Sequence, residues 1–113
     1  MPFPHPGQPV RGSDSGRPVM ALLDLLGRRW SLRILWELQL HPATFRELQA
    51  RCQGVSPSVL NTRLGELREA LLVRNGEAGY QLTDNGQELI RRCLPLAEWA
   101  EQWAAQLPPL AQE

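Results

Sequence analysis

Residues 43–86 read ATFRELQARCQGVSPSVLNTRLGELREALLVRNGEAGYQLTDNG, and this stretch decides the fold. Its first part, Thr44-Phe45-Arg46-Glu47, matches a capping box, in which the threonine hydroxyl and the glutamate carboxylate bind free backbone amides at a helix start. Apolar residues then recur at helical spacing, and Gly54 is expected to end the helix. The segment therefore predicts a short, capped helix.

A second helix is expected from Ser56 to Leu71, because serine is a good N-cap and Pro57 fits the first turn, where no N–H is needed. Its leucines fall on one narrow stripe that must face the core: Leu60, Leu64, Leu67 and Leu71. Two strand-like segments, 72–75 and 80–82, follow around a turn at 76–79. Two helices with a tight turn and then a hairpin predict a mainly α fold with a small β-hairpin, the winged helix-turn-helix. This module usually binds duplex DNA.

The face opposite the leucine stripe carries small polar side chains and a glycine. The residues near the N-terminus of such a helix reach base edges in the major groove, here Ser56, Ser58, Asn61, Thr62 and Arg63. Asparagine can pair with adenine, serine and threonine donate or accept, and arginine binds guanine or phosphate. The alternative is an ordinary solvated face, although such faces more often carry Glu and Lys. Contacts to the DNA backbone are expected from Thr44, Arg46, Arg68 and Arg74.

The flanking sequence predicts three more helices. Their expected spans are 19–26 before Gly27, 32–40 after an N-cap at Ser31, and a long helix that starts at Thr83-Asp84 and ends before Pro108. Pro95 is expected to kink or divide the last helix. Residues 1–17 are rich in Pro, Gly and Ser and predict a disordered arm. The winged helix-turn-helix domain with its C-terminal dimerisation helix is expected over 18–107, with a tail over 108–113.

The helix expected over 19–26 is apolar on nearly every side, with Asp24 as its polar residue. Such a helix cannot face water at the surface of a small monomer, so a second subunit is expected to cover it. The last helix carries a broad apolar face, whose tryptophans are expected to fill a dimer core; a ligand cavity there is the alternative. The predicted homodimer interface includes Met20, Leu22, Leu23, Leu26, Leu94, Trp99 and Trp103.

The 113 residues suffice for one domain with a single core, and their formal net charge is zero. Charge is unevenly spread: residues 18–75 carry eight arginines against five carboxylates, and residues 76–113 carry two against six. Arginine forks suit phosphate and guanine contacts. No apolar run reaches the roughly 18–20 residues of a membrane span, and no cleavable leader is visible. We therefore expect a cytoplasmic protein without membrane contact.

The residues that could carry chemistry are few. Cys52 and Cys93 lack metal-ligand spacing, so we expect small buried side chains rather than a disulfide or a zinc site. His5 and His41 have no nucleophile or carboxylate partner in the same element, and Ser56 is expected to be a helix cap. The sequence therefore predicts no enzyme, no metal and no cofactor.

A series of short motifs occurs in fixed order from Pro18 to Trp99. They are DLLGRRW (24–30), ILWEL (34–38), FREL (45–48), VS (55–56), LNTRLGEL (60–67), LV (72–73), YQLTDNG (80–86) and AEW (97–99). In this order and spacing the chain resembles the HxlR family of bacterial winged-helix regulators. The resemblance implies a homodimer joined through its first and last helices, with recognition helices roughly 34 Å apart on a pseudo-palindromic operator. It also implies repression or activation of nearby genes, often in response to electrophiles or oxidants.

The chain departs from that family at two places. Sensor members carry a cysteine directly before the proline that opens the first helix, where this chain has Arg17, so thiol sensing at that position is absent. The turn at 76–79 is shorter than the usual wing and holds Glu77, so wing contacts to DNA are expected to be weak or limited to Arg74. The short wing and the neutral net charge leave open a winged-helix protein-interaction module with weak or no DNA binding. No residue pattern specifies the operator, the regulated genes or a small-molecule inducer.

Overall fold

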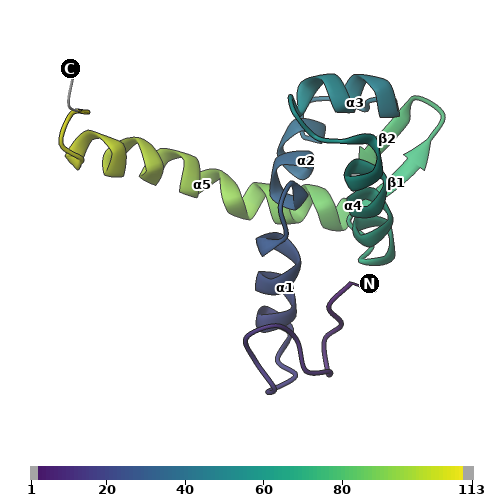
Figure 1. Cartoon of the computed structure of the whole chain (residues 1–113), viewed down its shortest axis with the longest axis horizontal. Helices are drawn as coiled ribbons and strands as arrows, with labels where there is room; N and C mark the ends of the chain where they lie inside the picture. Colours follow the sequence, from purple (N-terminus) through teal and green to yellow (C-terminus); the bar gives the residue numbers. More distant parts are fainter. Residues whose placement is uncertain (1–2, 111–113) are drawn as a thin grey trace.

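The computed structural model describes residues 3–110, so Met1 and Pro2 of the predicted arm and residues 111–113 of the predicted tail lie outside the described residues. The described part of the chain forms five helices and a two-stranded antiparallel sheet (Figure 1). They are α1 (Pro18–Gly27), α2 (Ser31–Leu38), α3 (Phe45–Arg51), α4 (Pro57–Glu69), β1 (Val73–Gly76), β2 (Gly79–Leu82) and α5 (Asp84–Gln106). The predicted mainly α fold with a small β-hairpin is confirmed.

The predicted starts of α3 and α4 are confirmed by their caps. Thr44 Oγ1 accepts from the backbone N of Glu47 at 3.1 Å, and Glu47 Oε1 accepts from the backbone N of Thr44 at 2.9 Å. The hydrogen bond from the backbone N of Thr44, with the Thr44 hydroxyl beside the carboxyl, lowers the pKa of Glu47, because both favour its charged form. At α4, Ser56 Oγ accepts from the backbone N of Val59 at 3.2 Å, and Pro57 occupies the first turn. Both helix starts are therefore fixed locally by sequence.

The start of α2 differs from the prediction that Ser31 is its N-cap. Trp30 is the N-cap residue, with a left-handed backbone (φ 80°), and Ser31 is the first residue of the helix. The Ser31 side chain is fully buried. The helix ends at Leu38 rather than at residue 40: Gln39 and Leu40 form a turn, and Pro42 then disfavours helical backbone at His41.

The core lies where α2, α3 and α4 meet the hairpin and the first turns of α5. Ile34, Leu35, Leu48, Leu60, Leu64 and Leu67 are completely or almost completely buried there. The prediction that Leu71 extends the leucine stripe is wrong: α4 ends at Glu69, and Leu71 is 64% exposed with a left-handed backbone (φ 62°). The backbone N of Leu72 donates to Leu67 O at 2.9 Å, which closes a Schellman-type helix end and reverses the chain at Leu71.

The hairpin is short and is attached to the segment before α3. Val73 pairs with Leu82 and Gly76 with Gly79, so only two residues form the turn. The backbone N and O of Ala43 exchange hydrogen bonds with Tyr80 at 2.9 and 2.7 Å. Gly79 has φ 111°, and a Cβ there would lie 2.4 Å from Ala43 O, so this close approach requires glycine. The hairpin is thereby fixed beside the helix-turn-helix.

The last helix, α5, begins in the core and then extends away from it (Figure 1). Thr83 caps it through a hydrogen bond from the backbone N of Gly86 at 3.0 Å. Pro95 was expected to kink or divide this helix, and it does not divide it, because α5 continues without a break to Gln106. The carbonyl of Arg91, which loses its helical donor, lies on an exposed part of the helix, where water can bind it. None of the helices in residues 3–110 is long and apolar enough to cross a membrane.

Residues 3–17, for which the sequence predicted disorder, follow a looped course in the structure. The backbone N of Gly7 donates to Gly16 O at 2.8 Å, and Val10 forms a bridge with Ser13. Phe3 is half-buried against the core, and the backbone N of Arg11 donates to Asp24 Oδ2 at 3.2 Å. The arm therefore folds back beside α1, which begins at Pro18.

Candidate nucleic-acid interface

The N-terminal half of α4 presents an exposed polar face. Ser56, Ser58, Asn61 and Thr62 are all exposed. Ser58 and Thr62 lie opposite the buried leucines of the helix, Asn61 lies beside them, and Ser56 is the N-cap residue. This face is small and uncharged, and it stands at a helix N-terminus, whose free N–H groups favour a phosphate. Four of the five residues predicted to meet base edges are thus brought together on one accessible surface.

The residues predicted to contact the DNA backbone are exposed on three different elements. Thr44 and Arg46 lie at the start of α3, Arg68 near the end of α4, and Arg74 on β1. Across the hairpin, Arg74 Nη2 donates a hydrogen bond to the amide oxygen of Gln81 at 2.6 Å, in the amide orientation that satisfies both groups. This hydrogen bond restrains the Arg74 guanidinium. These side chains therefore come from the two helices and the hairpin of the helix-turn-helix unit.

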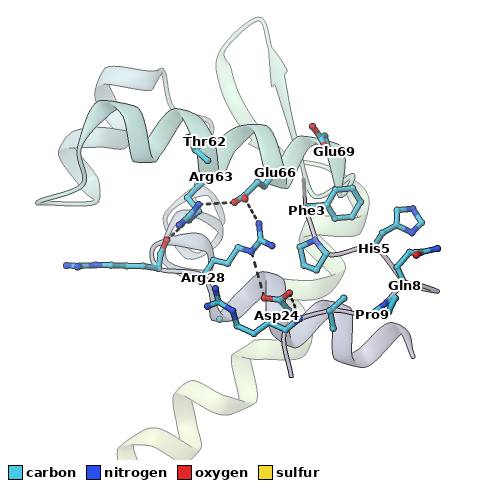
Figure 2. A pocket seen from close by; sticks show the side chains of 15 residues that line it. Phe3, His5, Gln8, Pro9, Asp24, Arg28, Thr62, Arg63, Glu66 and Glu69 are labelled. Atoms are coloured by element: carbon cyan, nitrogen blue, oxygen red, sulfur yellow. Dashed lines mark hydrogen bonds and ion pairs between the residues drawn. The ribbon is translucent and has the colours of Figure 1, made fainter. Parts of the chain in front are cut away.

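Arg63, the fifth predicted base contact, is directed into the protein (Figure 2). Its Nε donates to Arg29 O at 2.8 Å, and its Nη1 donates to Glu66 Oε1 at 3.1 Å. Glu66 is buried and also pairs with Arg28 of the α1–α2 link. Glu66 is not among the residues that the sequence pattern singled out, and the adjacent Arg28-Arg29 pair was the available signal for this cluster.

An open pocket of about 880 Å³ lies beside this cluster, between the N-terminal arm, the end of α1 and one flank of α4 (Figure 2). Phe3 and Pro4 form its wall on the arm, and Thr62 and Glu69 form its wall on α4. Within residues 3–110, no group of three or more His, Cys, Asp or Glu side chains is placed to hold a metal ion. The pocket walls are mixed aromatic and ionic, without a nucleophile beside a base.

A second surface is apolar and lies on α1 and α5. Its large exposed side chains are Val19, Leu23, Leu94, Leu96, Trp99, Trp103 and Leu107. The rings of Trp99 and Trp103 stack with centroids 6.0 Å apart and planes at 9°. Of the residues predicted at a dimer interface, Leu23, Leu94 and the two tryptophans are exposed, whereas Met20, Leu22 and Leu26 are half-buried.

The two cysteines lie in different surroundings. Cys52 is completely buried at the end of α3, and this burial raises the pKa of its thiol, since desolvation disfavours the thiolate. Cys93 is only partly buried on α5. Neither is paired in a disulfide.

In the folded protein, iodoacetamide should therefore modify Cys93 well before Cys52, because alkylation needs an accessible thiolate. Peptide mass spectrometry at increasing reaction times measures the two rates, and urea should make them similar. Modification of Cys52 as fast as that of Cys93 without denaturant would show that Cys52 is a reactive thiol after all.

The fold and this site define a winged helix-turn-helix, with a capped second helix that presents polar side chains beside a β-hairpin. The HxlR-like helix-turn-helix family model matches residues 25–108, and the chain belongs to this family. The chain is 30% identical over 88 residues to the uncharacterized HTH-type transcriptional regulator YvaP of Bacillus subtilis, covering 72% of this chain and 82% of the relative.

Solved structures agree with this assignment. The quinone-bound YodB of B. subtilis superposes with a TM-score of 0.70 at 30% identity, over 74% of this chain and 96% of YodB. A possible HxlR family transcriptional factor of Thermoplasma volcanium shares the fold, with a TM-score of 0.66 at 24% identity over 79% of this chain and 86% of that one. The protein is thus a DNA-binding transcriptional regulator, and its family is one of regulators rather than of enzymes.

Proposed function

We propose that the protein acts as a homodimer that binds a pseudo-palindromic operator, with one α4 helix in the major groove of each half-site, and thereby regulates nearby genes. The observation that carries this proposal is the exposed polar face at the start of α4, which stands on a buried leucine stripe. The buried leucines fix such a helix to the core, and its exposed polar face is free to enter the major groove. A cytoplasmic location follows from the position of its DNA target.

The proposed base contacts come from Ser56, Ser58, Asn61 and Thr62. Asn61 is the most specific of these, because its amide can donate to and accept from one adenine edge, whereas a hydroxyl suits several bases. Thr44, Arg46, Arg68 and Arg74 are proposed to bind phosphates, which fix the position of the protein on the duplex. Arg74 is the proposed contact from the hairpin, since the exposed Glu77 in the turn repels phosphate.

The proposed dimer buries the apolar surfaces of α1 and α5. Leu23 is 57% exposed and Trp99 is 56% exposed in the single chain. Large apolar side chains that are exposed in this way mark a surface that binds another molecule. The outer part of α5 extends from the core and is half-exposed or exposed along its length, which fits a helix that packs on a second copy (Figure 1). We propose residues 18–107 as the dimeric DNA-binding unit.

Binding to a duplex at increasing salt tests the proposed function. Three arginines per subunit, Arg46, Arg68 and Arg74, make six in a dimer, so log affinity should fall against log salt with a slope of about −5. Fluorescence anisotropy with labelled mixed-sequence DNA gives the slope. Absence of binding at low salt, or affinity that does not respond to salt, would instead support the protein-interaction module favoured by the short wing and the zero net charge.

A further inference from the structure

Glu66 stands out on α4 because it is a charged residue that is only 5% exposed. A buried carboxylate is tolerated when both of its oxygens are paired, because the loss of hydration is otherwise uncompensated. Here Arg63 Nη1 donates to Oε1 at 3.1 Å and Arg28 Nη1 donates to Oε2 (Figure 2). Glu66 is therefore the centre of a buried cluster.

The two arginines connect this centre to the first helix and to the link that follows it. Arg28 Nε lies 3.9 Å from Asp24 Oδ1, one turn back on α1, and the Arg28 side chain is only 13% exposed. Arg63 Nε donates to the backbone carbonyl of Arg29 at 2.8 Å. The cluster thus joins α4 to α1 through side chains and to the α1–α2 link through a main-chain oxygen.

The same contacts take Arg63 away from the polar face of α4. Its side chain is 20% exposed, and its Nε and Nη1 groups point into the protein. Arg68, on the same helix, is exposed. For Arg63 to turn its Nε and Nη1 groups toward DNA, it would have to leave these partners, which opposes binding because Glu66 would remain buried with one partner fewer.

We infer that Glu66, Arg28 and Arg63 are positioning residues: they set the angle between α4 and α1, and Arg63 does not touch DNA. This inference rests on the proposed function, because α1 is the helix that carries the exposed Leu23 of the proposed dimer surface. Asp24 lies on α1 next to Leu23, and Arg28 directly follows that helix, so the cluster connects the proposed dimer surface to the recognition helix. Its role is to keep the two α4 helices at the spacing and tilt of successive half-sites.

A double-mutant cycle tests this placement: Arg63→Ala, Glu66→Gln and both together, with a duplex selected from a random-sequence library by the wild-type protein. Each single variant should weaken binding about tenfold, and the double variant should be no weaker than Glu66→Gln alone, because both changes break the same contact. The salt slope of Arg63→Ala should equal that of the wild type, since no phosphate contact is lost. In that variant Glu66 keeps Arg28, so folding is retained even where Glu66→Gln does not fold.

Arg68→Ala is the matched control, because it removes another arginine from the same helix at an exposed position. It should reduce the magnitude of the salt slope by about 2 for a dimer, one phosphate contact per subunit. An equal reduction in Arg63→Ala, unchanged affinity in that variant, or fully additive losses in the double variant would overturn the inference while the proposed function stands. A wild-type protein that binds no duplex would overturn the proposed function itself, and with it any role in positioning.

Discussion

Replacing Leu23 and Trp99 together by glutamate should convert the protein to a monomer and weaken its binding to operator DNA by at least about 100-fold. Both side chains are more than half exposed in the single chain, one on α1 and the other on α5. In the proposed dimer they are buried, where an unpaired carboxylate is strongly unfavourable. A monomer contacts only one half-site, so it loses the gain in affinity that comes from linking two DNA-binding subunits.

Sedimentation velocity and electrophoretic mobility shifts measure the two effects. Leu40→Glu is the control, since Leu40 is equally apolar and 78% exposed but lies outside α1 and α5. It should leave both the mass and the affinity unchanged. A double variant that still sediments as a dimer would show that the apolar surface of α1 and α5 is not the subunit interface.

Gly86→Ala should destabilise the fold by about 1–3 kcal/mol, the usual range for adding atoms where a packed interior has no space. Gly86 is buried in the first turn of α5, and a Cβ there would lie 2.2 Å from Leu72 O and 3.2 Å from Leu82 Cβ. The nearest atom belongs to the backbone at the start of the hairpin, so relief requires movement of α5 or of the chain leading into β1.

Gly65→Ala provides a control of opposite sign. A Cβ at Gly65 meets nothing within 4 Å, and alanine in a helix interior is favoured over glycine by about 0.5–1 kcal/mol. Urea unfolding followed by circular dichroism gives both free energies of unfolding. If Gly86→Ala were as stable as the wild type, the close packing of α5 against the hairpin would be incorrect.

The parts of the fold that depend on neighbouring residues were predictable from the sequence. The capping box at Thr44, the Ser56-Pro57 helix start and the hairpin about residues 76–79 each follow from interactions within a few positions of the chain. The polar face of α4 also follows, because helical periodicity separates it from the leucine stripe. For these features local chemistry and tertiary structure agree.

The structure differs from the sequence-based predictions where the local backbone or contacts between distant residues determine the conformation. Helical periodicity continued the stripe to Leu71, but the Schellman-type end of α4 stops it two residues earlier. Ser31 has the chemistry of a cap, yet the left-handed backbone of Trp30 places it inside α2. Glu66 resembles a solvated charge at the margin of a helix until Arg28, from 38 residues earlier, is brought beside it. No rule based on spacing along one helix can supply that partner.

Hydroxyl-radical footprinting on a duplex selected by the wild-type protein shows whether two α4 helices bind successive turns of DNA. Two protected segments of similar strength are expected on one face of the duplex, with centres about 10–10.5 base pairs apart. One protected segment, or uniform weak protection without a repeat, would contradict this expectation.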